Sequence, residues 1–179
     1  MFHPLSARRI KEAVPECKII LLMRNPIDRA FSHYQLKLRR RQETLSFDEA
    51  LDAEAARLEG EEERILDSPF YHSLAHDRFS YMARGHYLEQ IIRWQKLFAP
   101  NQLMIIESGD LFKRTADVYQ RVLQFLDLPS WQPAQFGNRF PGKYKEKMLD
   151  ATRRRLIDHF APRNARLNAH LGTAFDWDK

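Results

Sequence analysis

The sequence predicts an α/β domain in which a parallel sheet is flanked by helices. Two short apolar runs, 19–23 and 102–107, are each followed within a few residues by a helical pattern, which is the usual order of elements in such folds. The order strand, helices, strand and helix implies a right-handed crossover between two parallel strands. The chain has 179 residues, enough for one domain with a substantial core. We therefore expect a single domain over residues 1–179.

The composition is typical of a folded protein that meets anionic ligands. Hydrophobic residues make up 44% and charged residues 30% of the chain, with a net charge of +5, and this charge favours anions without choosing among them. The single cysteine, Cys17, excludes an internal disulfide. No apolar run approaches the roughly 20 residues that span a bilayer, and the first residues lack the apolar core of a signal peptide. We expect a cytoplasmic protein.

The first elements of the chain are a short helix and a strand. Pro4 and Pro15 bracket a helical stretch over residues 5–14. The run 19–23 has no polar alternation, which predicts a strand that is covered on both faces.

A helix is expected to begin directly after this strand. Asn25 is a good N-cap and Pro26 a good first helical residue. The apolar residues then recur at helical spacing, at Ile27, Ala30, Phe31, Tyr34 and Leu38.

Two side chains at this junction form a candidate anion site. Arg24 lies between strand and helix, and Ser32 lies off the apolar stripe. Ligands of open α/β sheets bind beyond the carboxyl ends of strands, near helix N-termini, so Arg24 and Ser32 are placed to hold one phosphate group. The alternatives are an ion pair between Arg24 and Asp28 and a merely solvated Ser32.

Further helices and a second strand complete the predicted order. Ser46 and Glu49 form a capping box that opens a helix through Leu58. The remaining expected elements are a helix over 84–98, a strand over 102–107, a helix over 116–126, a helix over 147–160 that breaks at Pro162, and a last helix to Leu171.

Other charged and ligating side chains carry weaker signals. The basic clusters 37–41 and 153–155 are expected to be solvated helix faces, and no nucleic-acid-binding motif accompanies them. His72 and His76 have the spacing of helical metal ligands but lack a third ligand, so no metal is expected. A plain surface or packing role for these histidines is preferred, with a role as a base as the alternative.

The string from Arg24 to Tyr34, Arg-Asn-Pro-x-Asp-Arg-Ala-x-Ser-x-Tyr, resembles the 3′-phosphate-binding motif of sulfotransferases that use 3′-phosphoadenosine 5′-phosphosulfate (PAPS). The segment before the first strand and the block 85–129 are similar to bacterial members, and the ending from Gly172 to Trp177 is similar to heparan-type members. The resemblance implies a P-loop NTPase-like sheet, no metal, and binding of the 3′-phosphate by Arg24 and Ser32.

The resemblance has two departures. None of the six glycines forms a loop of the Gly-x-x-Lys-x-Gly-Thr type that cradles the 5′-phosphosulfate, so the chain resembles the C-terminal part of the family domain, incomplete at the N-terminus. Gly142 and Lys143 match part of a Lys-Gly-Arg loop that closes over the nucleotide, but Pro141 occupies the Lys position. Gly142, Lys143 and Lys145 are therefore expected cofactor-binding residues, with a solvated loop as the alternative.

The resemblance implies a sulfotransferase that moves a sulfuryl group from PAPS to a hydroxyl or amine of an acceptor, with carbohydrate as one candidate. No catalytic residue is assigned, because the family's lysine lies in the loop that has no match, and its base often lies upstream. The expected partners are the nucleotide and the acceptor, without nucleic acid. The alternatives are a truncated, non-catalytic nucleotide-binding module and a basic protein that binds RNA or another anionic polymer.

Overall fold

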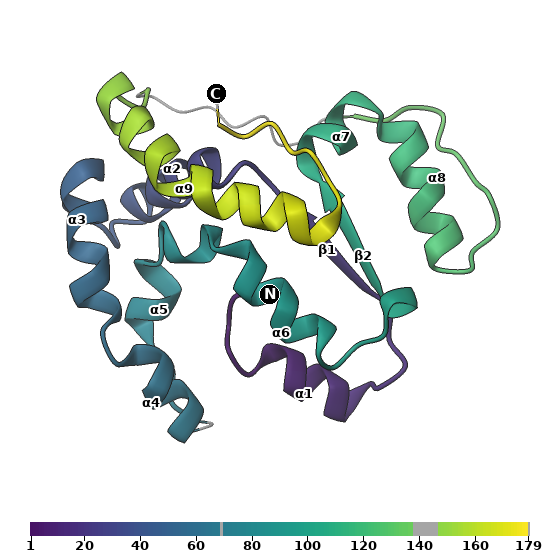
Figure 1. The fold of residues 1–179 in the computed structure, drawn as a ribbon, viewed down its shortest axis with the longest axis horizontal. Helices are drawn as coiled ribbons and strands as arrows, with labels where there is room; N and C mark the ends of the chain where they lie inside the picture. The colour runs from purple at the N-terminus through teal and green to yellow at the C-terminus, as the bar shows by residue number, and fades with distance from the viewer. Residues whose placement is uncertain (69, 138–146, 179) are drawn as a thin grey trace.

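The computed structural model describes residues 1–68, 70–137 and 147–178. Within these residues two strands, β1 (Ile19–Met23) and β2 (Leu103–Glu107), pair in parallel, in register from Ile19 with Leu103 to Met23 with Glu107. Figure 1 shows the two strands side by side, with helices around them. The predicted α/β class and the parallel crossover are therefore confirmed.

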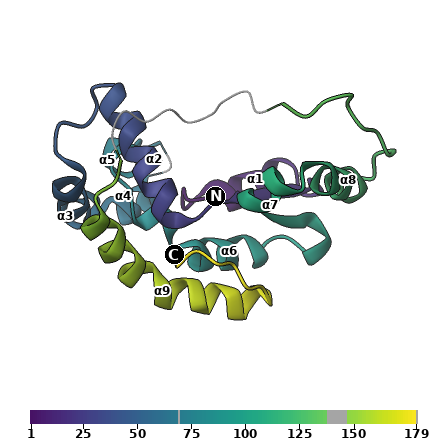
Figure 2. The ribbon, with the colours of Figure 1, turned by 90° about the horizontal axis from the view of Figure 1, so that it is seen from above.

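Helices supply the rest of the described secondary structure, and two views show their arrangement. Helices α3, α4 and α5 gather beside α2 at one end of the molecule, and α8 lies at the other end (Figures 1 and 2). No helix among the described residues is both long and apolar enough to cross a membrane. The helices are α1 (Ser6–Ala13), α2 (Pro26–Arg39), α3 (Phe47–Leu58), α4 (Glu61–Asp67), α5 (Leu74–Arg78), η1 (Ala83–Gly85), α6 (Tyr87–Gln95), η2 (Pro100–Gln102), α7 (Ser108–Lys113), α8 (Thr115–Phe125) and α9 (Asp150–Leu171).

Strand β1 is buried on one face only. Leu21 and Met23 are buried in a core shared with side chains of α6 and α9. The alternate side chains, Ile20 and Leu22, remain 39% and 58% exposed. The prediction of cover on both faces is therefore wrong for the described structure, because the packed helices cover only the face to which Leu21 and Met23 point.

Helix α2 begins as the sequence predicts. The Asn25 side chain accepts a hydrogen bond of 2.9 Å from the Ile27 amide, and Pro26 is the first helical residue. Ile27 and Ala30 are fully buried in a core with α3, Tyr81 and α9. This buried stripe fixes the rotation of α2 about its axis, so the opposite face of the helix carries its polar side chains.

Helix α9 continues through Pro162, contrary to the predicted break. It runs from Asp150 to Leu171 and bends near its middle (Figure 1). Leu156 and Phe160 are buried against α2, and Leu167 is buried against the sheet. Because both halves of α9 bury apolar side chains, packing outweighs the hydrogen bond that proline removes, and the proline kinks the helix without ending it.

Gly85 brings η1 into close contact with α2 and α9. A Cβ atom at this position would lie 2.8 Å from the Phe160 ring and 2.9 Å from the Pro26 Cβ. Only a glycine permits this approach without displacement of its neighbours. The contact also fixes the position of the preceding residue, Arg84.

We expect Gly85→Ala to lower the free energy of unfolding by about 1–3 kcal/mol, because the added methyl overpacks a core that already touches the glycine. Urea unfolding followed by circular dichroism measures this change. The matched control is Gly137→Ala, since nothing lies within 4 Å of a Cβ atom there. Equal effects of the two substitutions would contradict the close packing at Gly85.

Candidate functional site

The carboxyl ends of β1 and β2 lie together at one edge of the sheet, because Met23 pairs with Glu107. Arg24 follows β1 directly and its side chain is exposed. Its carbonyl oxygen accepts a hydrogen bond of 2.9 Å from the hydroxyl of Tyr87, a buried residue of α6. The backbone at Arg24 is thus held in place while its guanidinium group faces solvent.

A cavity of about 490 Å³ opens beside this strand end. The structure brings Arg24 and Ser32 together in its lining, as the sequence analysis expects, although their role as phosphate ligands stays a prediction. The other lining residues are mostly cationic. The full lining consists of Arg24, Arg29, Ser32, His33, Leu36, Lys37, Arg39, Arg40, Asp77 and Arg84.

The alternative ion pair between Arg24 and Asp28 is not formed. Asp28 Oδ1 instead accepts a hydrogen bond of 2.7 Å from Arg153 Nη2 on α9. No carboxylate pairs with Arg24 in the ranges that the structure describes. Its charge is therefore available to a ligand in the cavity.

The basic cluster 37–41 contributes to the cavity and is only partly solvated. Lys37 is 5% exposed, and its Nζ lies 3.2 Å from Asp77 Oδ2 on α5, so the expectation of a solvated face is wrong for this residue. Arg39 and Arg40 are exposed at the same cavity. Asp77 is the single carboxylate among the described lining residues, so the cavity is strongly cationic.

Arg84 reaches this cavity from η1 in a fixed orientation. Its Nε donates to Ser80 Oγ at 2.7 Å, and its Nη2 donates to the carbonyls of His76 and Asp77, both at 3.1 Å. The guanidinium group also stacks over the Phe2 ring, 5.0 Å from its centroid. The remaining N–H groups of Arg84 are thereby aimed before any ligand arrives.

His33 lies among these cations as a neutral side chain. Burial, together with the positive charges of Arg29, Arg84 and Lys37, lowers the pKa of His33 to about 3. Its Nδ1 is buried without a hydrogen-bond partner. The permanent positive charge of the cavity therefore comes from arginine and lysine.

The sequence analysis missed Arg29, Lys37 and Arg84 as cavity residues. A signal for Arg29 was present, because Arg29 and Ser32 lie at i, i+3 spacing on the face of α2 opposite its apolar stripe. Lys37 had no such signal, since it lies near the apolar stripe. Arg84 had no such signal, since it comes from a segment more than 40 residues away in the sequence.

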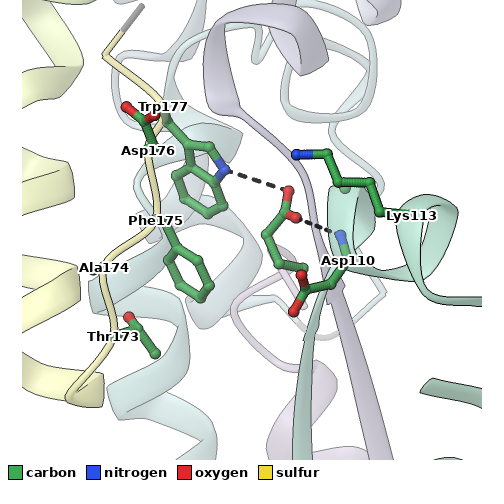
Figure 3. Close-up of a pocket in the computed structure, with 9 residues that line it drawn as sticks. Asp110, Lys113, Thr173, Ala174, Phe175, Asp176 and Trp177 are labelled. Atoms are coloured by element: carbon green, nitrogen blue, oxygen red, sulfur yellow. Dashed lines mark hydrogen bonds between the residues drawn. The ribbon is translucent and has the colours of Figure 1, made fainter. Parts of the chain in front are cut away.

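A second cavity, of about 510 Å³, lies at the end of β2. Figure 3 shows Lys113 on one side and the segment 173–177 on the other. Trp177 Nε1 donates to Glu107 Oε1 at 3.4 Å, and the Trp177 carbonyl accepts from Asn25 Nδ2 at 3.1 Å. The C-terminal segment thus joins the ends of both strands. Its lining holds three carboxylates and one lysine, so this cavity suits an anion less well than the first.

The other site residues of the sequence analysis fall elsewhere. Gly142, Lys143 and Lys145 lie outside the described residues. His72 is exposed, whereas the His76 ring is buried and stacks on Phe2 at 4.2 Å. In residues 1–68, 70–137 and 147–178, no three His, Cys, Asp or Glu side chains are grouped to hold a metal ion.

The sequence of the chain is similar to those of known proteins. The chain is 26% identical over 130 residues to bifunctional heparan sulfate N-deacetylase/N-sulfotransferase 1 of Caenorhabditis briggsae, over 72% of the chain and 14% of that protein. The protein of the same name from Caenorhabditis elegans is also 26% identical, over 83% of the chain and 16% of its own length. The chain thus spans about a sixth of the length of these relatives.

A solved structure and a family model agree with these similarities. The crystal structure of a sulfotransferase from Alicyclobacillus acidocaldarius matches with a TM-score of 0.72 and 31% identity, over 99% of this chain and 64% of that chain. The family model described as the sulfotransferase domain matches residues 4–154. This range contains both strands and the lining of the cationic cavity, and the chain therefore belongs to the sulfotransferase family.

Proposed function

We propose that the cationic cavity binds the 3′-phosphate of PAPS, and that the chain takes part in transfer of the sulfuryl group to a hydroxyl or amine of an acceptor. The observation that carries the proposal is the meeting of Arg24 and Ser32 in a cavity with six cationic side chains and one carboxylate. A phosphate monoester bears about −1.5 to −2 charges at pH 7, which this charge balance favours.

The donor set also fits a phosphate group chemically. Arg24 supplies a planar guanidinium fork, which matches phosphate oxygens, and Ser32 supplies a hydroxyl from the polar face of α2. These groups bind and orient the nucleotide, which when bound supplies the sulfuryl group. Sulfuryl transfer depends largely on positioning and on cationic stabilisation of developing charge, so orientation is the contribution that we assign to them.

A carbohydrate acceptor is the class that the relatives favour, since the names of the two Caenorhabditis proteins refer to heparan sulfate. A second candidate function is nucleotide binding without transfer. It is favoured by the sequence, because none of the six glycines forms a loop of the type that cradles the 5′-phosphosulfate. Release of 3′-phosphoadenosine 5′-phosphate from PAPS in the presence of N-desulfated heparan distinguishes the two functions.

We expect Arg24→Ala to weaken binding of 3′-phosphoadenosine 5′-phosphate by about 10- to 100-fold, because a charge-assisted hydrogen bond contributes about 1.5–3 kcal/mol. Ser32→Ala should weaken binding by about tenfold or less. Isothermal titration calorimetry measures both values, with adenosine 5′-phosphate as the ligand that lacks the 3′ group.

The control variant is Arg121→Ala, which removes an exposed arginine of α8 that does not line the cavity. It should bind as the wild type does. If the wild type shows no preference for the 3′-phosphorylated nucleotide, the proposed function is wrong. Binding of RNA with a steep salt dependence and no nucleotide preference would instead support a basic polymer-binding protein.

The neutral state of His33 predicts a loss of stability in acid. Its native pKa of about 3 lies below the ordinary value of 6.5. As the pH falls from about 6.5 toward 3, His33 binds a proton in the unfolded chain but not in the native chain. The free energy of unfolding therefore decreases over that range. The melting temperature of His33→Gln should fall less steeply between pH 7 and pH 4 than that of the wild type.

The matched control is His72→Gln, because His72 is exposed. This variant should keep the wild-type slope. His76 and His86, whose pKa values burial lowers to about 4, remain in both variants and maintain part of the acid effect. A wild-type slope in His33→Gln would show that His33 binds its proton equally in the native and unfolded states, and would contradict the lowered pKa.

A further inference from the structure

Arg29 is a cavity cation without an ion-pair partner. Its Nη2 donates to the Tyr81 carbonyl, and its Nε is buried with no hydrogen-bond partner. No ion pair joins Arg29 to a carboxylate in the part of the chain that the structure describes. The carboxylate of Glu54 attracts Arg29 electrostatically without forming an ion pair with it. The two Glu54 oxygens instead accept hydrogen bonds from the Met82 and Ala83 amides at 2.7 and 2.8 Å.

Two other charges, both buried, have close partners of opposite sign among the described residues. Lys37 pairs with Asp77 at 3.2 Å, and the buried Glu43 pairs with Arg57 at 2.6 Å. A buried charge without such a partner costs several kcal/mol. Arg29 is partly buried, with a buried Nε and no such partner, so it lowers the stability of the ligand-free protein unless an anion from outside the chain compensates its charge.

The lining of the cavity carries more positive charge than its one carboxylate compensates. Its inner wall consists of the three less exposed cations, Arg29, Lys37 and Arg84, of which Lys37 and Arg84 pair with Asp77 at 3.2 and 3.6 Å. Asp77 is exposed, as are Arg39 and Arg40, so water and salt screen these three side chains. A phosphate monoester carries about −1.5 to −2 charges at pH 7, whereas a diester carries one charge and compensates less of the excess.

We propose that Arg29 is a further ligand of the 3′-phosphate, and that with Lys37 and Arg84 it makes the cavity select a doubly charged phosphate monoester over singly charged phosphate esters. This inference rests on the proposed function. It assigns the selectivity to charge at the inner wall, whereas Arg24 and Ser32 supply the outer contacts at the strand end and the helix face.

The test compares adenosine 3′-phosphate with its 3′-methyl phosphate diester at pH 8 by calorimetry. The wild type should bind the monoester at least about tenfold more tightly. Arg29→Met, which keeps an unbranched apolar stem and removes the charge, should weaken monoester binding by about tenfold or more and reduce the preference over the diester. Arg29→Lys should retain most of that preference, because it retains the charge.

Arg121→Met controls for the loss of one positive charge away from the cavity, and circular dichroism confirms that each variant is folded. Wild-type affinity and preference in Arg29→Met would overturn the inference and leave the proposed function standing. If Arg29→Met does not fold, the inference is still overturned when the wild type binds the monoester and the diester with equal affinity. A wild type that binds neither ester overturns the proposed function and this inference with it.

Discussion

The junction between β1 and α2 is the constraint on which the rest of the site depends. The Asn25 side chain caps α2, and the Asn25 amide group also binds the Trp177 carbonyl of the C-terminal segment. The buried stripe of α2 then fixes the rotation of the helix. Because strand end and helix are both held, Arg24 and the polar face of α2 meet at one cavity. The site is therefore a consequence of core packing on the opposite side of one helix.

The second wall of the cavity is built by close contact between distant segments. Gly85 lets η1 touch both Pro26 and Phe160, and this contact holds Arg84 opposite α2. Arg84 is then oriented by hydrogen bonds to backbone carbonyls and by stacking on Phe2. Such preorganisation means that a ligand meets donors already in place, so little side-chain entropy is lost on binding.

The sequence was sufficient for features that local chemistry determines. The strand at 19–23, the Asn25 cap and the Ser46 capping box follow from residue types at short spacing, and the parallel pairing follows from the order of the elements. Features set by tertiary packing were not predicted. Pro162 remains inside a helix because both halves of α9 are buried, and Lys37 is buried because Asp77 comes from another helix. The inner wall of the cavity belongs to this second class, since its charges come from α2, α5 and η1.

The charge arrangement links the stability of the protein to its ligand. Ion pairs between exposed side chains contribute little to stability, but a partly buried cation such as Arg29 without a carboxylate partner is a cost to the folded chain. That cost falls on the ligand-free protein and is removed when an anion enters the cavity. A ligand that binds only the native state stabilises it in proportion to the logarithm of its concentration over Kd. In our proposal, the cationic inner wall thus lowers the stability of the empty site, and the same charges strengthen the binding of a phosphate group there.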